Sequence, residues 1–451
     1  MRLFKTSLVF LSVLAATAKA VPSIVADGNA FFVDGTSNRF YIRGVDYQPG
    51  GSSNLFDPLA DAETCKRDIK YFTDLGINTV RVYSVDNTAD HDECMSALED
   101  AGIYVIVDVN NPHASILRSP QNMAACSYNS LYINEVLATV QEFAQYNNTL
   151  GFFAGNEVIN DGPSLVSAPY VKATVRDIKT FLKNRNFRQV LVGYSAAAVD
   201  EYNLPSAEYF NCGDDELARV DMFGFNDYTW CGDATMQTSS YSLKVQEFSN
   251  YSIPLFFSEF GCNKPSPRVF SEIEALYSTD MSAVFSGGLV YEYSQEASNY
   301  GLVEIDGNSI TTDTDFDNLK KQYADTKNPS GDGGYSKNLK YSDCPKKDAT
   351  WNATTDIPDT PAGALKYVNA NEKPVGGGFN ASTQFCIGEV DDSGNSTISE
   401  TTTSGGSSTS ATTSEATSSS SKKSGAGFTV PKVSGLSFLG VAGAVAGMVL
   451  L

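Results

Sequence analysis

The sequence of 451 residues predicts a (β/α)8 barrel followed by an irregular, disulfide-linked C-terminal extension. Eight short apolar runs end in polar residues, and continuous apolar runs are typical of parallel strands buried on both faces. Amphipathic helical patterns fill several of the intervals, as alternating strands and helices require. The alternative is a doubly wound open sheet, but no glycine-rich phosphate turn follows the first run.

The eight runs supply the strands of the predicted barrel in chain order. They occupy residues 40–47, 79–85, 104–109, 150–158, 190–197, 222–228, 255–261 and 287–294. Between the first two runs, "ETCKRDIKYFTDLG" places Ile69, Phe72 and Leu75 at helical spacing and stops at Gly76, which predicts one complete helix. The segments "HDECMSALEDAG", "LYINEVLATVQEFAQY" and "APYVKATVRDIKTFLKN" follow the same pattern.

The sequences at both ends of the chain are typical of processing signals. Residues 1–20 combine basic residues, a short apolar stretch and a small-x-small end, which predicts a signal peptide cleaved after Ala20. Residues 424–451 place small residues and a spacer before an apolar tail, which is typical of a removed GPI-anchor signal with Ser424 or Gly425 as the attachment residue. Membrane-anchoring helices are the alternatives, but both apolar stretches are short for a span.

The segments between these ends differ in composition. Residues 21–330 form the predicted catalytic barrel, and the Gly-, Asn- and Pro-rich residues 331–390 form an irregular extension packed on it. Residues 391–423 are rich in Ser and Thr, so they cannot bury a core and we expect a disordered, O-glycosylated stalk.

Composition excludes several classes of function. The net charge of −21 argues against nucleic acid as a partner, because phosphate binding needs a basic surface. The chain has only two histidines, which leaves few residues for a metal site or a Ser/His/Asp triad. No cofactor-binding loop occurs either, so we expect neither metal nor cofactor. The default oligomeric state is a monomer.

Eight cysteines in a secreted chain imply disulfides, for which the sequence alone allows 105 pairings. N-glycosylation motifs also fit an extracellular protein. They begin at Asn147, Asn250, Asn352, Asn380 and Asn395.

Two of the strand-like runs, "LGFFAGNEV" and "LFFSEFGC", each carry a glutamate near the end. In a barrel, functional groups come from the C-terminal ends of strands, so Glu157 on the fourth strand and Glu259 on the seventh should meet at one mouth. A buried carboxylate is unfavourable unless it is paired, protonated or used. The alternative is that each glutamate only forms a salt bridge at a strand end. Other predicted strands end at Asp46, Asp108, Tyr228 and Tyr291.

A pair of carboxylates facing one cleft suits glycoside hydrolysis or transfer, and a separation of about 5 Å favours retention of configuration. Glu157 is the expected acid/base, because its apolar approach should raise its pKa by desolvation. Glu259 is the expected nucleophile, kept ionised by hydrogen bonds from phenols such as that of Tyr228. Asn156 is placed to hold the sugar 2-hydroxyl group.

With these residues in place, the chain resembles glycoside hydrolase family 72, the fungal GPI-anchored β-1,3-glucanosyltransferases of the Gel/Gas/Phr type. The resemblance covers residues from about 27 to 345. It depends on "FYIRGVDYQPGG", "NTVRVYSVD", "HDECM", "AGIYVIVDVN", "GNEVIND", "FNDYTWCG", "SEFGC" and "GGLVYEYSQEASNYGLV". Only two cysteines follow the barrel, so the chain resembles the short subfamily that lacks a cysteine-rich carbohydrate-binding module.

The resemblance implies a retaining enzyme that cleaves an internal β-1,3-glucan bond and joins the new reducing end to the non-reducing end of another glucan. It implies an anchored location at the outer face of the plasma membrane or in the cell wall. It assigns the acid/base to Glu157 and the nucleophile to Glu259. The implied substrate contacts are Gln48, Tyr83, Asp108, Asn156, Tyr228 and Tyr291.

The resemblance also implies three disulfides, Cys65–Cys94, Cys212–Cys344 and Cys231–Cys262, and leaves Cys126 and Cys386 to pair by elimination. Two alternative functions stay open at this point. One is a plain endo-β-1,3-glucanase, in which water resolves the glycosyl-enzyme, and the other is a non-catalytic glucan-binding wall protein.

Overall fold

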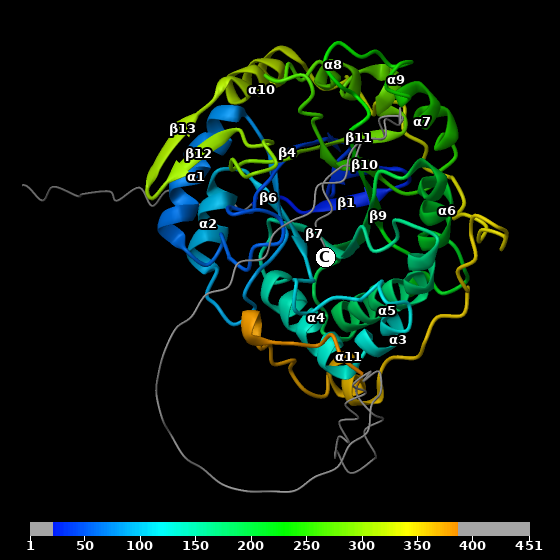
Figure 1. Cartoon of the computed structure of the whole chain (residues 1–451). Helices are drawn as coiled ribbons and strands as arrows, with labels where there is room; N and C mark the ends of the chain where they lie inside the picture. Colours follow the sequence, from blue (N-terminus) through cyan, green and yellow to red (C-terminus); the bar gives the residue numbers. More distant parts are fainter. Residues whose placement is uncertain (1–20, 387–451) are drawn as a thin grey trace, which may run out of the picture. The chain divides into compact units, whose positions relative to one another are not determined.

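Eight parallel strands close into a barrel in the computed structural model, which describes residues 21–386 (Figure 1). Each strand pairs with the next along the chain, and β11 pairs with β4 to close the ring. The predicted (β/α)8 fold is therefore confirmed. The barrel strands are β4 (Ile42–Asp46), β5 (Thr79–Val82), β6 (Tyr104–Asp108), β7 (Thr149–Asn156), β8 (Leu191–Ala196), β9 (Met222–Asp227), β10 (Leu255–Phe260) and β11 (Phe285–Val290).

The predicted signal peptide, the stalk with Asn395, and the GPI signal with Ser424 or Gly425 lie outside the described residues. Among the residues that are described, no helix has both the length and the hydropathy needed to cross a bilayer.

Helices follow most of the barrel strands and surround them (Figure 1). The first, α1, shows how local sequence sets the ends of a helix. Asp61 caps the start by accepting hydrogen bonds from the backbone of Glu63 and Thr64, and Gly76 ends the helix in the left-handed region at φ 73°. The α-helices are α1 (Ala62–Leu75), α2 (Asp92–Asp100), α3 (Met123–Ser127), α4 (Ser130–Phe143), α5 (Ala168–Asn184), α6 (Asp200–Phe210), α7 (Tyr241–Glu247), α8 (Glu272–Leu276), α9 (Thr279–Ser282), α10 (Thr314–Asp325) and α11 (Leu365–Val368). Short 3-10 turns are η1 (Pro163–Ser167), η2 (Glu216–Ala218), η3 (Ala362–Ala364) and η4 (Gly378–Asn380).

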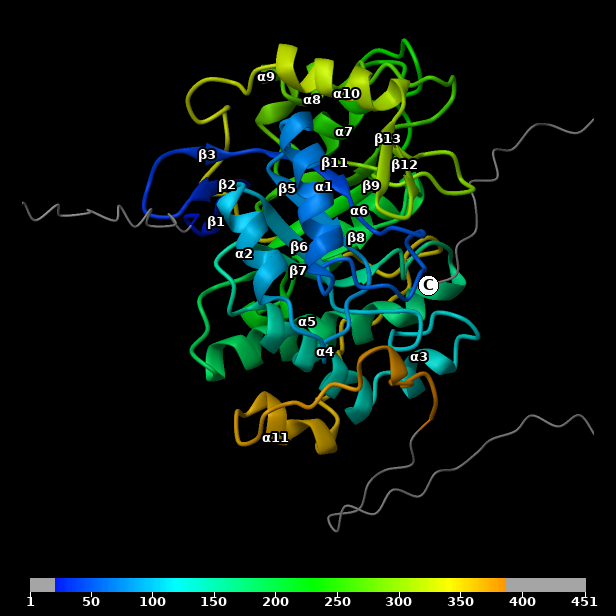
Figure 2. The same ribbon diagram turned by 90° about the vertical axis from the view of Figure 1, so that its left-hand side faces the viewer.

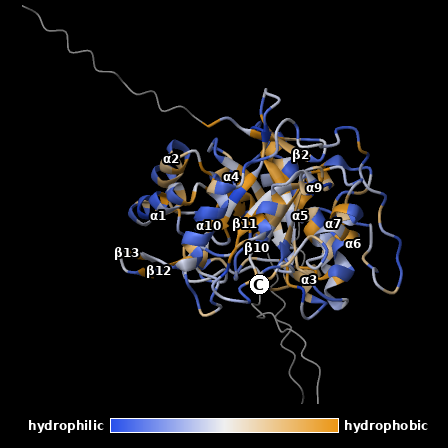
Figure 3. Ribbon diagram, turned by 90° about the horizontal axis from the view of Figure 1, so that it is seen from above, coloured by the Kyte–Doolittle hydropathy of each residue, from blue (hydrophilic) through white to orange (hydrophobic). Residues whose placement is uncertain are grey.

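A small antiparallel sheet packs against the N-terminal ends of the barrel strands. It consists of β1 (Ile24–Asp27), β2 (Ala30–Val33) and β3 (Arg39–Phe40). Phe31 lies edge-on to Phe256 at 5.8 Å, and Phe40 lies edge-on to Tyr104 at 5.2 Å. Figure 3 shows the apolar strands enclosed by helices whose outer faces are hydrophilic. This sheet covers one end of the barrel, so the polar strand ends lie at the other.

Residues 331–386 run along the outside of the barrel (Figure 2). Near its beginning, Ser336 N donates a hydrogen bond to Asn29 Oδ1 (2.8 Å). Further on, Arg176 Nη1 of α5 donates to Pro358 O (2.7 Å), and α11 packs against α4 and α5. The extension has little periodic structure and is held by bonds between side chains and backbone. A separate hairpin, β12 (Val303–Asp306) and β13 (Ser309–Thr312), follows the last barrel strand.

Four disulfides cross-link the described residues, which contain no free cysteine. They are Cys65–Cys94, Cys126–Cys386, Cys212–Cys344 and Cys231–Cys262. Closing loops of 29 to 260 residues in the unfolded chain stabilises the fold by roughly 3–5 kcal/mol per bond in the chain-entropy model. Four of the five predicted glycosylation motifs are described, and each of their asparagines is exposed. They are Asn147, Asn250, Asn352 and Asn380.

His91, at the start of α2, is fully buried between two carboxylates. Its Nε2 lies 2.8 Å from Asp57 Oδ2, and its Nδ1 lies 3.1 Å from Glu142 Oε1. Burial alone would lower the pKa of His91, but the hydrogen bonds to these carboxylates outweigh burial and raise it to about 9. The charged imidazole therefore joins α2, α4 and the loop before α1.

We expect His91 to make stability pH-dependent. Because its pKa is raised from an unfolded value of about 6.5, its contribution is complete below that pH and is lost as the pH rises through about 9. The free-energy gap between wild type and His91→Gln should therefore narrow by about 3 kcal/mol between pH 6 and pH 10. Urea unfolding at both pH values measures the gap, and a constant gap would contradict the charged state.

Candidate active site

The structure brings the two predicted glutamates to the C-terminal end of the barrel. Glu259 lies in β10, with its Cα paired in register to Asn226 of β9, and Glu157 directly follows β7. Asn226 Nδ2 donates to Glu157 Oε1 (2.8 Å), while Asn226 Oδ1 accepts from Ser258 Oγ (2.9 Å). One asparagine thus connects the end of β7 to the residue before Glu259.

Three donors hold the Glu259 carboxylate. Tyr83 OH donates to Oε1 (2.8 Å), Tyr228 OH donates to Oε2 (2.7 Å), and Arg81 Nη1 lies 3.2 Å from Oε1. Glu259 is only 7% exposed. The pKa of Glu259 is raised to about 7. Burial is the largest cause and the charge of Glu157 adds to it, whereas Arg81 and the two phenols oppose the rise by favouring the anion.

Arg81 is the positive charge at the base of this site and has no exposed surface. Its Nε and Nη2 donate to the two oxygens of Asp108 (2.9 and 2.8 Å), which is the bidentate geometry that fixes a guanidinium in place. Asp46 lies on its other side, 4.0 Å away, and both oxygens of this buried carboxyl lack a hydrogen-bond partner. Burial therefore raises the pKa of Asp46 well above its usual range and favours its neutral form.

Glu157 is held mainly through its backbone. Its N–H donates to Ser195 O (2.8 Å), and its carbonyl oxygen accepts from Arg118 Nη1 (2.7 Å). Its φ of 50° lies in the left-handed region, which is uncommon for a residue with a side chain. The side chain is half-buried and therefore more open to solvent than that of Glu259. Glu259 is thus the more deeply buried of the two, because β10 carries its glutamate inside the strand and β7 ends before its own.

Asn156 belongs to a network of short polar side chains at the same level of the barrel. Its Oδ1 accepts from Ser195 Oγ (2.7 Å) and from Asn226 Nδ2 (3.1 Å). Ser195 Oγ in turn lies 2.9 Å from Ser258 Oγ. These contacts fix the orientation of the Asn156 amide and leave its Nδ2 end facing away from them.

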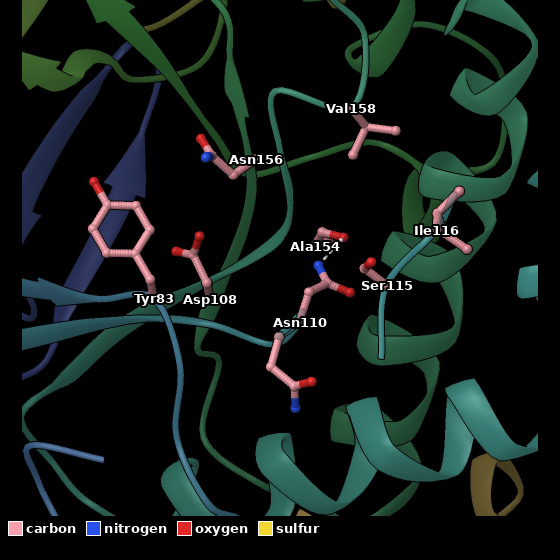
Figure 4. Close-up of a pocket in the computed structure, with 9 residues that line it drawn as sticks. Tyr83, Asp108, Asn110, Ser115, Ile116, Ala154, Asn156 and Val158 are labelled. Carbon is pink, nitrogen blue, oxygen red and sulfur yellow. Dashed lines mark hydrogen bonds between the residues drawn. The ribbon is translucent and has the colours of Figure 1, made fainter. Parts of the chain in front are cut away.

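A pocket lies beside Asn156 and Val158, the two neighbours of Glu157 in the chain, and Figure 4 shows the side chains around it. Three of the expected substrate-contact residues, Tyr83, Asp108 and Asn156, line this same pocket. Tyr228 and Tyr291 lie near this site with their ring centroids 6.3 Å apart, and both are half-buried. The pocket residues are Tyr83, Asp108, Asn110, Asn111, Ser115, Ile116, Ala154, Asn156 and Val158.

Gln48, which the resemblance implies as a substrate contact, is hydrogen-bonded to four backbone groups in the structure. It is 1% exposed. Its Nε2 donates to Phe56 O (2.6 Å) and Asn54 O (3.2 Å), and its Oε1 accepts from the backbone N–H groups of Tyr83 (3.2 Å) and Ser84 (3.1 Å). The side chain therefore joins the backbone at Asn54 and Phe56 to the backbone at Tyr83 and Ser84.

Three residues of the site escaped the sequence analysis. Arg81 stands in the run "TVRVYSV", where a charge inside an apolar strand is a readable sign of a buried partner. Asn226 interrupts "MFGFNDY" in the same way. Arg118 lies in a loop without periodicity, and nothing in the sequence around it points to Glu157.

Comparisons with known proteins agree with this geometry. A family model for glycoside hydrolase 72, described as Glucanosyltransferase, matches residues 13–327. The chain is 64% identical over 403 residues to the 1,3-beta-glucanosyltransferase PGA4 of Candida albicans, and the match covers 88% of each protein. It is 54% identical over 375 residues to the 1,3-beta-glucanosyltransferase GAS5 of Saccharomyces cerevisiae, covering 82% of this chain and 77% of that protein.

Solved structures of Gas2 from Saccharomyces cerevisiae share the fold. One is a glutamate-to-glutamine variant in complex with laminaritetraose and laminaripentaose, with a TM-score of 0.69 and 38% identity, and the match covers 76% of this chain and 75% of that one. Another, in complex with a compound numbered 9, has a TM-score of 0.70 and 39% identity, and the match covers 76% of this chain and 77% of that one.

The buried charge of Glu259 should lower stability as pH rises. Its pKa is raised to about 7, above the unfolded value near 4.5, so the native state binds the extra proton between these values. We expect Glu259→Gln to gain about 3 kcal/mol relative to wild type between pH 4 and pH 8. Urea unfolding at both pH values tests this. The exposed-site control Glu304→Gln should shift by less than about 0.5 kcal/mol, and an equally small shift for Glu259→Gln would refute the expectation.

Proposed function

This chain belongs to the glucanosyltransferase family of glycoside hydrolase 72, and we propose that it elongates β-1,3-glucan by a retaining double displacement with Glu157 as acid/base and Glu259 as nucleophile. The observation that carries the proposal is the unequal environment of two carboxylates at one end of the barrel. Glu259 is buried and bonded through both oxygens, whereas the half-buried Glu157 is fixed through its backbone.

In the first step, the Glu259 carboxylate attacks the anomeric carbon of an internal glucosyl unit. Glu157 gives its proton to the departing 3-oxygen, so the downstream chain leaves as an alcohol and the upstream chain becomes an ester of Glu259. The donors Arg81, Tyr83 and Tyr228 favour the anionic nucleophile before attack and fix the direction of its lone pairs. Rotation of the carboxylate is thereby prevented.

In the second step, Glu157, now a carboxylate, takes the proton from the 3-hydroxyl at the non-reducing end of a second glucan. That oxygen attacks the anomeric carbon and releases Glu259, so two inversions give net retention. The half-buried position of Glu157 suits a group that must meet first a leaving oxygen and then an incoming one. If water takes the place of the acceptor, the same geometry gives hydrolysis, and the ratio depends on how well the acceptor chain is positioned.

The remaining site residues receive distinct proposed roles. Asn156 holds the sugar 2-hydroxyl through the amide end that the polar network leaves free. Asp108 and Tyr83 line the pocket where further glucosyl units lie, and Tyr228 and Tyr291 offer ring faces beside them. Gln48 supports Tyr83 rather than touching the substrate.

The setting of the enzyme is also a proposal. We propose that the protein is secreted, glycosylated and held as a monomer by a GPI lipid on the outer face of the plasma membrane or in the cell wall. The exposure of Asn147, Asn250, Asn352 and Asn380 supports glycosylation, and four disulfides suit an oxidising compartment.

The function is tested by incubating the enzyme with reduced β-1,3-oligosaccharides and sizing the products. Wild type should yield products longer than the substrate, with retained anomeric configuration by NMR. Glu157→Gln should lower kcat by about 10²–10⁴, the usual contribution of general acid–base catalysis. Glu259→Gln should abolish detectable transfer, because no ester can form.

The exposed-site variant Glu304→Gln should transfer like wild type. Only shorter products from wild type would make the protein a glucanase. Undiminished transfer by either catalytic-site variant would disprove the assignment of that residue.

The anchor is tested in cells that express the full chain. Treatment with a phospholipase C specific for phosphatidylinositol should release active protein from the membrane fraction, and a chain ending at residue 423 should be secreted directly. Retention of the full chain after treatment, in cells where a known GPI protein is released, would favour an anchoring helix at residues 424–451.

A further inference from the structure

We propose that the C-terminal extension is part of the catalytic apparatus, because it holds the loop between β6 and α3 so that Arg118 positions Glu157. The inference rests on the proposed acid/base role of Glu157. It assigns Arg118 as a positioning residue, and the Cys126–Cys386 disulfide as the clamp on which that residue depends.

The extension contacts this loop repeatedly near residue 383. Thr383 N donates to His113 O (3.0 Å), and Gln384 Nε2 donates to Ser115 Oγ (2.7 Å). The disulfide between Cys126 and Cys386 closes the same contact covalently. Residues 113–126 are therefore attached to the extension at their beginning and at their end.

A second contact carries this attachment to the middle of the loop. Leu117 N donates to Ser127 Oγ (2.9 Å), and Ser127 is the neighbour of the clamped Cys126. Arg118 is the next residue, and its Nη1 donates to Glu157 O (2.7 Å). The path from the disulfide to the backbone of the proposed acid/base thus consists of one covalent bond and two hydrogen bonds joined by adjacent residues.

Glu157 needs such support because of its backbone. At φ 50° it adopts a left-handed conformation that costs a residue with a side chain of order 1–3 kcal/mol and persists only where the surroundings impose it. Ser195 O holds its N–H, and Arg118 holds its carbonyl. When Arg118 is removed, the peptide after Glu157 is free to rotate, and the carboxyl moves with it. A displacement of about 1 Å can reduce catalysis 10²-fold.

The extension also shapes the pocket. Ser115 and Ile116 line it, and both belong to the clamped loop. The same clamp therefore acts on the proton donor and on one wall of the sugar-binding pocket.

The test uses the dependence of a retaining glycosidase on its leaving group. Glu157 must protonate a sugar alcohol, but dinitrophenolate departs without a proton, so a misplaced acid harms only the first substrate. We expect Arg118→Ala to lower kcat/KM on β-1,3-oligosaccharides about 10–100-fold. The rate of the dinitrophenol burst from a dinitrophenyl β-laminarioligosaccharide should fall less than about 3-fold. Arg118→Lys, which keeps one donor, should recover part of the loss.

Arg219→Ala is the matched control, because Arg219 is also half-buried and donates to a backbone carbonyl at 2.7 Å, that of Gly213, away from the site. It should leave both substrates unaffected. Cys126→Ser/Cys386→Ser should show the selective loss of Arg118→Ala, whereas Cys65→Ser/Cys94→Ser, which also removes one disulfide, should not. Thermal unfolding identifies any variant that fails to fold, and the leaving-group ratio is read only from folded protein at a temperature below its Tm.

Equal losses on both substrates, or no loss on either, would overturn the inference for Arg118 while leaving the proposed function intact if Glu157→Gln itself shows the selective loss. If Glu157→Gln loses both activities equally, the acid/base assignment fails, and the inference fails with it.

Discussion

The charge of one buried guanidinium organises the open end of the barrel. Arg81 has no exposed surface, and three carboxylates, those of Asp46, Asp108 and Glu259, lie within 4.0 Å of it. Removing one partner of a buried ion pair costs about 3–5 kcal/mol, because the other charge stays behind unpaired. Asp108 forms the bidentate pair with Arg81, so Glu259 accepts a hydrogen bond from only one guanidinium nitrogen and keeps its reactivity. Asp46 forms no hydrogen bond with Arg81, and its raised pKa favours the protonated form.

The positions of the two glutamates relative to the ends of their strands give them different environments. Glu259 lies inside β10 opposite Asn226, where neighbouring strands surround it and supply phenols and a cation. Glu157 stands one residue beyond β7, where its N–H still bonds to Ser195 O of β8 but its carbonyl oxygen accepts from the side chain of Arg118. A nucleophile benefits from being rigid and desolvated, and a proton carrier benefits from access to two different oxygens. Glu259 is the penultimate residue of β10 and Glu157 is the first residue after β7, and this difference in position produces both environments.

The fold could be predicted from the sequence because burial leaves a pattern that is local. Each of the eight apolar runs overlaps one barrel strand, and polar residues at the ends of these runs identified Glu157 and Glu259. Contacts across long sequence separations leave no such pattern. The bond from Arg118 to Glu157 joins residues 39 apart, and the one from Gln384 to Ser115 joins residues 269 apart. The contacts of Arg81 and Tyr83 with Glu259 likewise join residues more than 170 positions apart.

The two disulfides of the extension also change what proteolysis does to the molecule. Cys344 is joined to Cys212 and Cys386 to Cys126, so the 41 residues between Cys344 and Cys386 form a strap fastened at both ends. A protease that cuts this strap once divides the polypeptide, yet both pieces remain covalently attached to the barrel. Such a nicked molecule would keep its full mass on a non-reducing gel and would separate into two bands only after reduction.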